Sequence, residues 1–129
     1  MNKIKYTKNV LWLKPFVECS SKLIPLNKIT NIRGYKVRKG CEELAYGSTI
    51  YKKGKYSINI KTHNLVGYSK YSGSSISIIL DTLAHELAHV KTGFEHTPEH
   101  YELTARIALK FSQILYKNGI IDTSKRFRG

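Results

Sequence analysis

The sequence has few cysteines and few acidic residues, and it has no long apolar run. These shortages limit the kinds of protein that the chain can form. Its two cysteines, Cys19 and Cys41, form no CxxC pair and lack zinc-finger spacing, so we expect free thiols in a reducing compartment. No apolar run approaches the roughly 20 residues of a membrane span. Lys14 and Pro15 interrupt the first apolar run too early for a signal-peptide core. We therefore expect a cytoplasmic protein that crosses no membrane.

The length and composition fit one globular domain. A chain of 129 residues with 41% hydrophobic residues is long enough to form one hydrophobic core. It is too short for two domains of ordinary size. No internal repeat, low-complexity tract or linker-like stretch divides it. The expected domain therefore covers residues 1–129 and ends in a basic tail at about residues 122–129. The sequence leaves the oligomeric state open.

The scarcity of acids gives the chain a net charge of +13, and this charge is unevenly spread. Residues 1–80 contain 15 lysines and arginines against three acids, and residues 103–129 contain six against one. Residues 81–102 reverse the balance, with one lysine, five acids and four of the five histidines. A patch rich in acids and histidines suits a divalent cation. The basic remainder suits a polyanion such as nucleic acid, or is a solvated lysine-rich surface without a partner.

The first half of the chain predicts one helix and a small sheet. A proline suits the first turn of a helix expected over about residues 14–24. Residues 29–39 give a weak strand signal. Residues 44–51 and 55–61 are rich in Tyr, Ile and Thr, and a hairpin turn at residues 52–54 joins them. As an edge strand, residues 55–61 would be free to pair with an extended substrate.

A longer helix is predicted after a loop rich in glycine and serine at residues 64–75. Apolar residues recur at three- and four-residue steps from Ile76 onward, which is typical of an amphipathic helix. Ser74 or Ser75 would be its N-cap, and Gly93 stands just past its expected end.

A second long helix has the strongest start signal in the sequence. Thr97 is the expected N-cap, Pro98 occupies the first helical position, and Asn118-Gly119 is the expected stop. Together these elements predict an α+β fold with a small sheet of about three strands and three principal helices.

The motif that carries chemistry lies on the first of the two long helices, where residues 85–89 read His-Glu-Leu-Ala-His. Because residues four apart share one face of a helix, His85 and His89 can hold one zinc ion, with Glu86 beside the metal-bound water as general base. His96 follows after one tight turn as a third nitrogen ligand. Asp81 lies one turn before His85 and could accept the free N–H of its imidazole. Three protein ligands and an open position favour a catalytic zinc, one per chain, over a structural one.

These residues resemble the core of a known group of enzymes. The run from His85 to His89, a short turn, and His96-Thr97-Pro98-Glu99-His100-Tyr101 look like the SprT-like and WLM zinc metalloproteases, which are small α+β, gluzincin-like enzymes. In this resemblance His96 corresponds to the third ligand and Thr97 to the helix cap. His100 and Tyr101 correspond to the aromatic position and are candidates for contacts with the ligands. The match covers residues 81–101, and the extra zinc-finger segment of some such proteins is absent.

The same resemblance offers a second candidate for the third ligand. Glu102-Leu103-Thr104-Ala105 is similar to the ExxA stretch on the second helix of other gluzincins, in which the glutamate binds zinc. The expected ligand set is therefore His85 and His89 with either His96 or Glu102.

Two other function classes compete with a peptidase. His85, His89 and the run Gly93-Phe94-Glu95-His96 are similar to an endoribonuclease-like family whose site reads HGxLHxxGYDH. That family lacks a glutamate after its first histidine, and the spacing here is one residue longer. A zinc-dependent binding module without turnover would instead need four protein ligands. The sequence favours zinc-dependent peptide-bond hydrolysis by a metalloendopeptidase, with nucleic-acid-associated proteins as the most attractive substrates.

Overall fold

A four-stranded mixed sheet forms one layer of the protein. The computed structural model describes residues 3–35, 46–62 and 73–117. Its strands are β1 (Lys5–Tyr6), β2 (Ile29–Tyr35), β3 (Gly47–Lys52) and β4 (Lys55–Lys61), in the order β1-β2-β4-β3. Strand β2 pairs parallel with both β1 and β4, whereas β3 pairs antiparallel with β4. The expected α+β class is confirmed, with one strand more than the sequence suggested.

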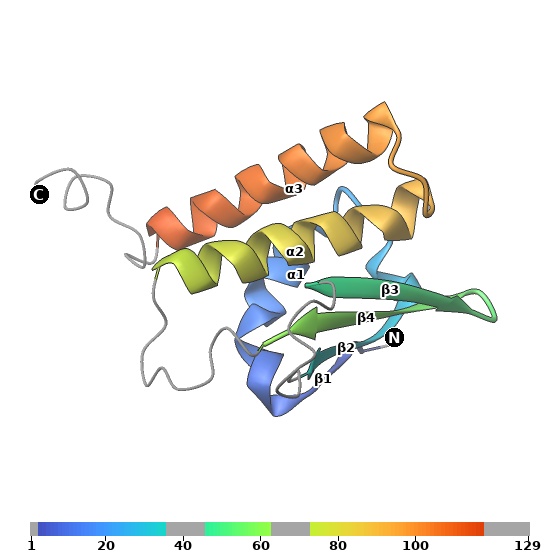
Figure 1. The fold of residues 1–129 in the computed structure, drawn as a ribbon, viewed down its shortest axis with the longest axis horizontal. Helices are drawn as coiled ribbons and strands as arrows, with labels where there is room; N and C mark the ends of the chain where they lie inside the picture. Colours follow the sequence, from blue (N-terminus) through green and yellow to red (C-terminus); the bar gives the residue numbers. More distant parts are fainter. Residues whose placement is uncertain (1–2, 36–45, 63–72, 118–129) are drawn as a thin grey trace, which may run out of the picture.

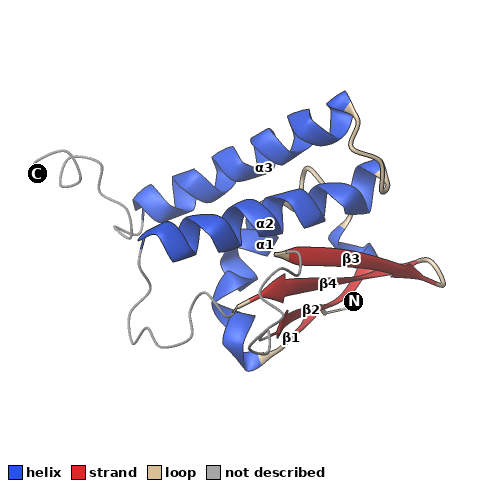
Figure 2. Ribbon diagram, in the orientation of Figure 1, coloured by secondary structure: helices blue, strands red, loops and turns tan. Residues whose placement is uncertain are grey.

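Three helices cover one face of this sheet. They are α1 (Lys14–Cys19), α2 (Gly73–Thr92) and α3 (Pro98–Lys117), with a short 3₁₀ helix over Lys8–Leu13 leading into α1. Helix α2 lies on the sheet beside β3 and β4, and α3 runs antiparallel to α2 on its other side (Figures 1 and 2). In the described ranges, no helix is long and apolar enough to cross a membrane.

The core lies between α2 and the sheet and continues under α1 and α3. Isoleucines from β2 and β4 meet the apolar stripe of α2, and the ring of Phe16 in α1 packs edge-on against Phe111 of α3 with centroids 5.5 Å apart. The fully buried side chains at the sheet–helix contact include Ile32, Ile58, Ile60, Leu83 and Leu87. Burial of these apolar side chains is the main force that fixes α2 on the sheet.

The hairpin between β3 and β4 fixes which side chains face α2. Its turn is Lys53-Gly54, with φ of 52° and 80°, the positive values that a tight two-residue hairpin requires. The register pairs Gly47 with Ile60, Thr49 with Ile58 and Tyr51 with Tyr56. Because Ile58 and Ile60 are buried toward α2, the side chains of Thr49 and Tyr51 point to the same face.

Several predicted element ends were wrong. Helix α1 ends at Cys19 rather than near residue 24, because the Ser20 hydroxyl donates to Val17 O at 2.6 Å and the chain continues in turns. Helix α2 begins at Gly73, so Ser74 and Ser75 lie inside the helix and neither is its N-cap. Packing of the apolar stripe downstream outweighs the weak helix propensity of this Gly-Ser start. The rest of the predicted loop, residues 64–72, and the tail at residues 122–129 lie outside the described residues.

The predicted edge strand was also wrong. Strand β4 lies inside the sheet, hydrogen-bonded to β2 on one side and to β3 on the other. Its backbone therefore has no free edge for a substrate. Among the strands that the structure describes, β3 is the edge strand next to α2.

Gly47 allows β3 to lie close to α2. A Cβ atom at this position would lie 2.5 Å from Thr82 Cγ2 on α2 and 3.0 Å from the backbone oxygen of Asn59 on β4. The first contact is far shorter than side chains tolerate, so any larger residue would push the strand and helix apart.

We expect Gly47→Ala to lower the free energy of unfolding by about 1–3 kcal/mol, the usual range for overpacking. Ser48→Ala, on the exposed side of the same strand, should change it by less than about 0.5 kcal/mol. Urea denaturation of both variants measures the difference. Equal stabilities would show that β3 does not depend on this close approach.

Candidate metal centre

Three imidazole rings converge at the C-terminal end of α2. Within the described part of the chain, His85, His89 and His96 each offer one ring nitrogen, and these atoms lie within 4.8 Å of one another. His85 Nε2 lies 3.2 Å from His89 Nε2 and 3.2 Å from His96 Nε2. Three nitrogens bound tetrahedrally to one zinc ion at about 2.0–2.1 Å would be separated by about 3.3 Å. The three histidines could therefore bind a metal ion with little rearrangement.

The turn after α2 orients His89 and returns the chain to the site. Gly93 has φ of 87° and its N–H donates to His89 O at 3.0 Å, which ends the helix in a left-handed cap. His89 Nδ1–H donates to Gly93 O at 2.8 Å. This bond assigns the proton to Nδ1 and leaves Nε2 with a lone pair that faces His85.

The next helix starts immediately beyond the third histidine. Thr97 caps α3 as predicted, since its hydroxyl accepts the N–H of His100 at 3.2 Å. His96 thus stands at the junction between a helix stop and a helix start, both of which are fixed by local hydrogen bonds. This placement directs its imidazole back over α2.

His100 lies beneath the cluster and is fully buried. Its ring stacks on His89, with centroids 4.2 Å apart, and meets His85 edge-on at 4.5 Å. His100 Nε2–H donates to the backbone oxygen of His85 at 3.1 Å, whereas its Nδ1 has no partner among the described residues. His100 is not one of the three converging residues, and it packs between α3 and the two histidines of α2.

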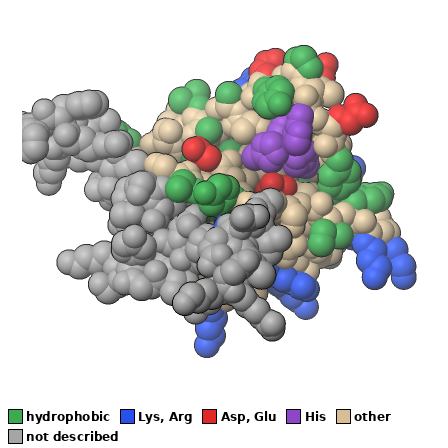
Figure 3. All heavy atoms as spheres, viewed as in Figure 1, with side chains coloured by type: hydrophobic (Ala, Val, Ile, Leu, Met, Phe, Trp, Pro, Cys, Tyr) green, Lys and Arg blue, Asp and Glu red, His purple; other side chains and the backbone are tan. Residues whose placement is uncertain are grey.

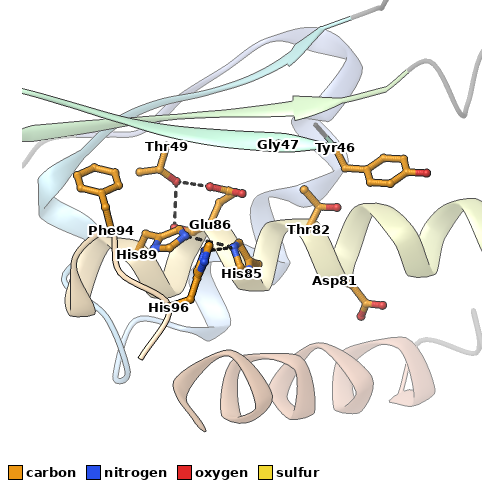
Figure 4. Close-up of a pocket in the computed structure, with 10 residues that line it drawn as sticks. All are labelled: Tyr46, Gly47, Thr49, Asp81, Thr82, His85, Glu86, His89, Phe94 and His96. Atoms are coloured by element: carbon orange, nitrogen blue, oxygen red, sulfur yellow. Dashed lines mark hydrogen bonds between the residues drawn. The ribbon is translucent and has the colours of Figure 1, made fainter. Parts of the chain in front are cut away.

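Glu86 lies in the same wall as the histidines, with an exposed fraction of only 6%. The hydroxyl of Thr49 on β3 lies 2.7 Å from Glu86 Oε1 and 3.3 Å from Glu86 O, and donates to the carboxylate (Figure 4). Burial raises the pKa of the Glu86 carboxyl, although the Thr49 hydrogen bond and the charges of His89 and His96 oppose the rise. Sequence reasoning did not find Thr49, because its only signal was its place on a predicted strand.

A cleft of about 560 Å³ opens between β3 and the C-terminal part of α2. The three histidines and Glu86 line it, with Tyr46, Gly47, Thr49, Asp81, Thr82 and Phe94 around them (Figure 4). Figure 3 shows the histidines gathered on one face, with acidic side chains nearby and lysines and arginines toward the lower edge of the view. The cleft is bounded on one side by the sheet edge and on the other by a cluster of nitrogen donors.

The remaining predicted residues surround this cleft. Asp81 lies exposed at its rim and, within the described part of the chain, makes no hydrogen bond with His85. Tyr101 is exposed and its ring centroid lies 6.4 Å from that of His96. Glu102 is exposed on α3 and is not one of the three converging residues. The choice between His96 and Glu102 stays a prediction.

Burial disfavours the charged forms of His85 and His100. It lowers the pKa of His85 from 6.5 to about 4, with further lowering by the charges of His100, His89 and His96. Burial also lowers the pKa of His100. The imidazole of His85 is therefore neutral near pH 7, and a neutral imidazole is the form that ligates a metal ion.

Comparisons with protein-family models, with curated proteins and with solved structures give no match. The site is therefore interpreted from its own residues.

We expect the protein to bind about one zinc ion per chain, and His96→Ala to weaken that affinity at least about tenfold, or about 1.4 kcal/mol. Glu102→Ala should leave it within about threefold, because its side chain is exposed away from the converging nitrogens. Competition with a chromophoric chelator measures both. The opposite ranking would make Glu102 the third ligand.

We also expect the metal-free protein to lose stability as the pH falls from about 6.5 to about 4. The His85 pKa is about 4 in the folded chain and 6.5 in the unfolded one. Between these values the unfolded chain binds a proton that the folded chain does not, so acid favours unfolding. Urea denaturation with EDTA at several pH values tests this, with His85→Gln as the control. An identical pH dependence in the two proteins would contradict the assignment.

Proposed function

We propose that this protein is a zinc-dependent metalloendopeptidase that uses His85, His89 and His96 as ligands and Glu86 as general base. The observation that carries the proposal is the buried carboxyl of Glu86, held in the wall of the cleft that the three histidines line. A carboxylate in this place is not needed to hold a metal ion that already has three nitrogen donors. Burial of a carboxylate costs free energy, and the one hydrogen bond from Thr49 offsets that cost only in part, as the raised pKa shows, so a carboxyl placed here is a candidate for a chemical role.

The number of donors supports a catalytic rather than a structural ion. Structural zinc usually has four protein ligands, whereas catalytic zinc has three and an open position. Among the described residues the converging donors are three, because His100 lies beneath them and is not part of the group. An all-imidazole set favours zinc over magnesium or calcium, which prefer oxygen ligands.

Each residue around a bound zinc ion would have a separate role in hydrolysis. A bound zinc ion would polarise the scissile carbonyl and lower the pKa of a water in its open position to about 7. Glu86 would accept a proton from that water and pass it to the leaving amine. Thr49 holds Oε1 of the carboxylate, which leaves the second oxygen to take the proton. The raised pKa of Glu86 makes it a better proton acceptor than an exposed carboxylate.

Strand β3 gives the substrate a place to bind. Among the described strands it is the edge strand beside the cleft, so an extended peptide could pair with its outer backbone groups and lie across the cluster. Thr49 lies on this strand, so the same strand would align the peptide and the general base.

The charge distribution suggests the class of protein cleaved. The chain carries +13 overall, while residues 81–102 are acidic and contain the site. A basic body would keep the enzyme near nucleic acid, and an acidic cleft would accept basic segments of the proteins bound there. Nucleic-acid-associated proteins are therefore the proposed substrates.

We expect Glu86→Gln to retain zinc and the fold but to lower peptide hydrolysis by about 10² to 10⁴, because only the proton acceptor is removed. Glu18→Gln, on the exposed side of α1, should keep full activity. Cleavage of a quenched fluorescent casein measures activity, and metal analysis and circular dichroism check the two conditions. Undiminished hydrolysis by Glu86→Gln would end the general-base assignment, whereas wild-type hydrolysis of RNA but of no protein would favour the endoribonuclease alternative.

A further inference from the structure

Three aromatic side chains form a continuous surface at one end of the cleft. This aromatic surface consists of Tyr51, Tyr56 and Phe94. The rings of Tyr51 and Tyr56 lie 4.9 Å apart, and Phe94 lies 6.2 Å from Tyr56. Phe94 in turn stacks on the ring of His89, with centroids 5.9 Å apart. The surface therefore runs from the hairpin between β3 and β4 to the histidine cluster without a break.

The aromatic surface is more exposed than packing requires. Tyr51 is 53% exposed and Phe94 is 51% exposed, so about half of each side chain contributes to no contact within the described residues. Helix α2 meets β3 at Thr49 and ends at Thr92, and Phe94 in the turn that follows it meets Tyr56. Within the described residues, this end of the cleft thus presents two half-exposed aromatic side chains, with the partly buried Tyr56 between them.

We propose that the aromatic surface is a specificity site that takes a large apolar side chain of the peptide substrate. This proposal rests on the peptidase function and extends it from the bond that is cleaved to the sequence around that bond. The peptide, paired with β3, would carry this side chain on the face that looks toward α2.

The register of β3 gives the position of that side chain. Thr49 and Tyr51 are two residues apart on one face of β3, which corresponds to about 7 Å along an extended chain. Thr49 contacts Glu86, so the bond to be cleaved lies near the level of Thr49. A peptide antiparallel to β3 places residues N-terminal to that bond over Tyr51. The selected side chain is therefore the second or third residue before the cleaved bond.

The charges nearby favour a peptide over a single-stranded nucleic acid. Aromatic rings can also stack on bases, and Lys52 and Lys53 follow Tyr51 at the hairpin turn. However, Glu95 is exposed beside Phe94, and Glu86 lies along the same path toward the histidines. Carboxylates on both sides of His89 would repel a phosphate backbone. In a peptide antiparallel to β3, an acidic residue on the N-terminal side of the selected apolar residue would lie near Lys52 and Lys53 at the turn.

Peptide binding to zinc-loaded Glu86→Gln tests the site without relying on turnover. Two fluorescein-labelled peptides that carry either Phe or Ala at both the second and the third residue before the central bond are titrated by fluorescence anisotropy. We expect the Phe peptide to bind at least about tenfold more tightly, as burial of one aromatic side chain predicts. Adding Tyr51→Ala or Phe94→Ala should reduce this preference to less than about threefold. Tyr116→Ala, an exposed aromatic on α3, is the matched control and should leave it unchanged.

The result overturns the proposal if both peptides bind alike, or if the preference for Phe survives both substitutions. It is also overturned if an oligothymidylate, but no peptide, binds in a way that depends on Tyr51 and Phe94. Zinc content is measured in each variant, because Phe94 contacts a ligand while Tyr51 does not. Selective binding without hydrolysis by the wild type would reject the peptidase and keep the site. Hydrolysis by the wild type without a preference for Phe would keep the peptidase function and reject the aromatic surface as a specificity site.

Discussion

The reversal of the chain at Gly93 is the constraint on which the convergence of the three histidines depends. Two histidines on one helix supply only two donors, and the third must return from beyond the end of that helix. The positive φ of Gly93 makes this return possible, and its carbonyl accepts the Nδ1–H of His89. A β-carbon here would meet no neighbour, so the requirement comes from the backbone conformation and not from lack of space.

Burial favours the neutral forms of His85, His100 and Glu86. It lowers the pKa of His85 and His100 and raises that of Glu86, so each group is driven toward its neutral form. The ring nitrogens of His85, His89 and His96 face one another, and protons alone satisfy such an arrangement poorly. His85 Nε2 carries at most one hydrogen, although it faces a nitrogen of both neighbours. A divalent cation satisfies all three nitrogens at once.

The features that could be predicted from the sequence are those with local causes. Thr97 and Pro98 mark the start of α3 through a cap hydrogen bond, and the alternation in β4 marks a half-buried strand. The position of β4 within the sheet could not be predicted, because strand order depends on pairings between distant segments. Strand β1 has only two residues and carries no recognisable pattern. The contact of Thr49 with Glu86 was hidden for the same reason, since 37 positions separate the two residues.

The histidine group joins residues that are close in sequence, whereas the Thr49–Glu86 contact joins distant ones, and this difference affects the order in which they form. The three converging histidines lie within one helix and the turn after it, so they can assemble as soon as α2 and the start of α3 form. Their loop-closure entropy is small. The carboxylate of Glu86 finds Thr49 only after the hairpin has docked on α2, which requires long-range closure. The three histidines can therefore come together before Glu86 meets Thr49, and a metal ion bound at that stage would act as a template for the helix pair before the cleft exists.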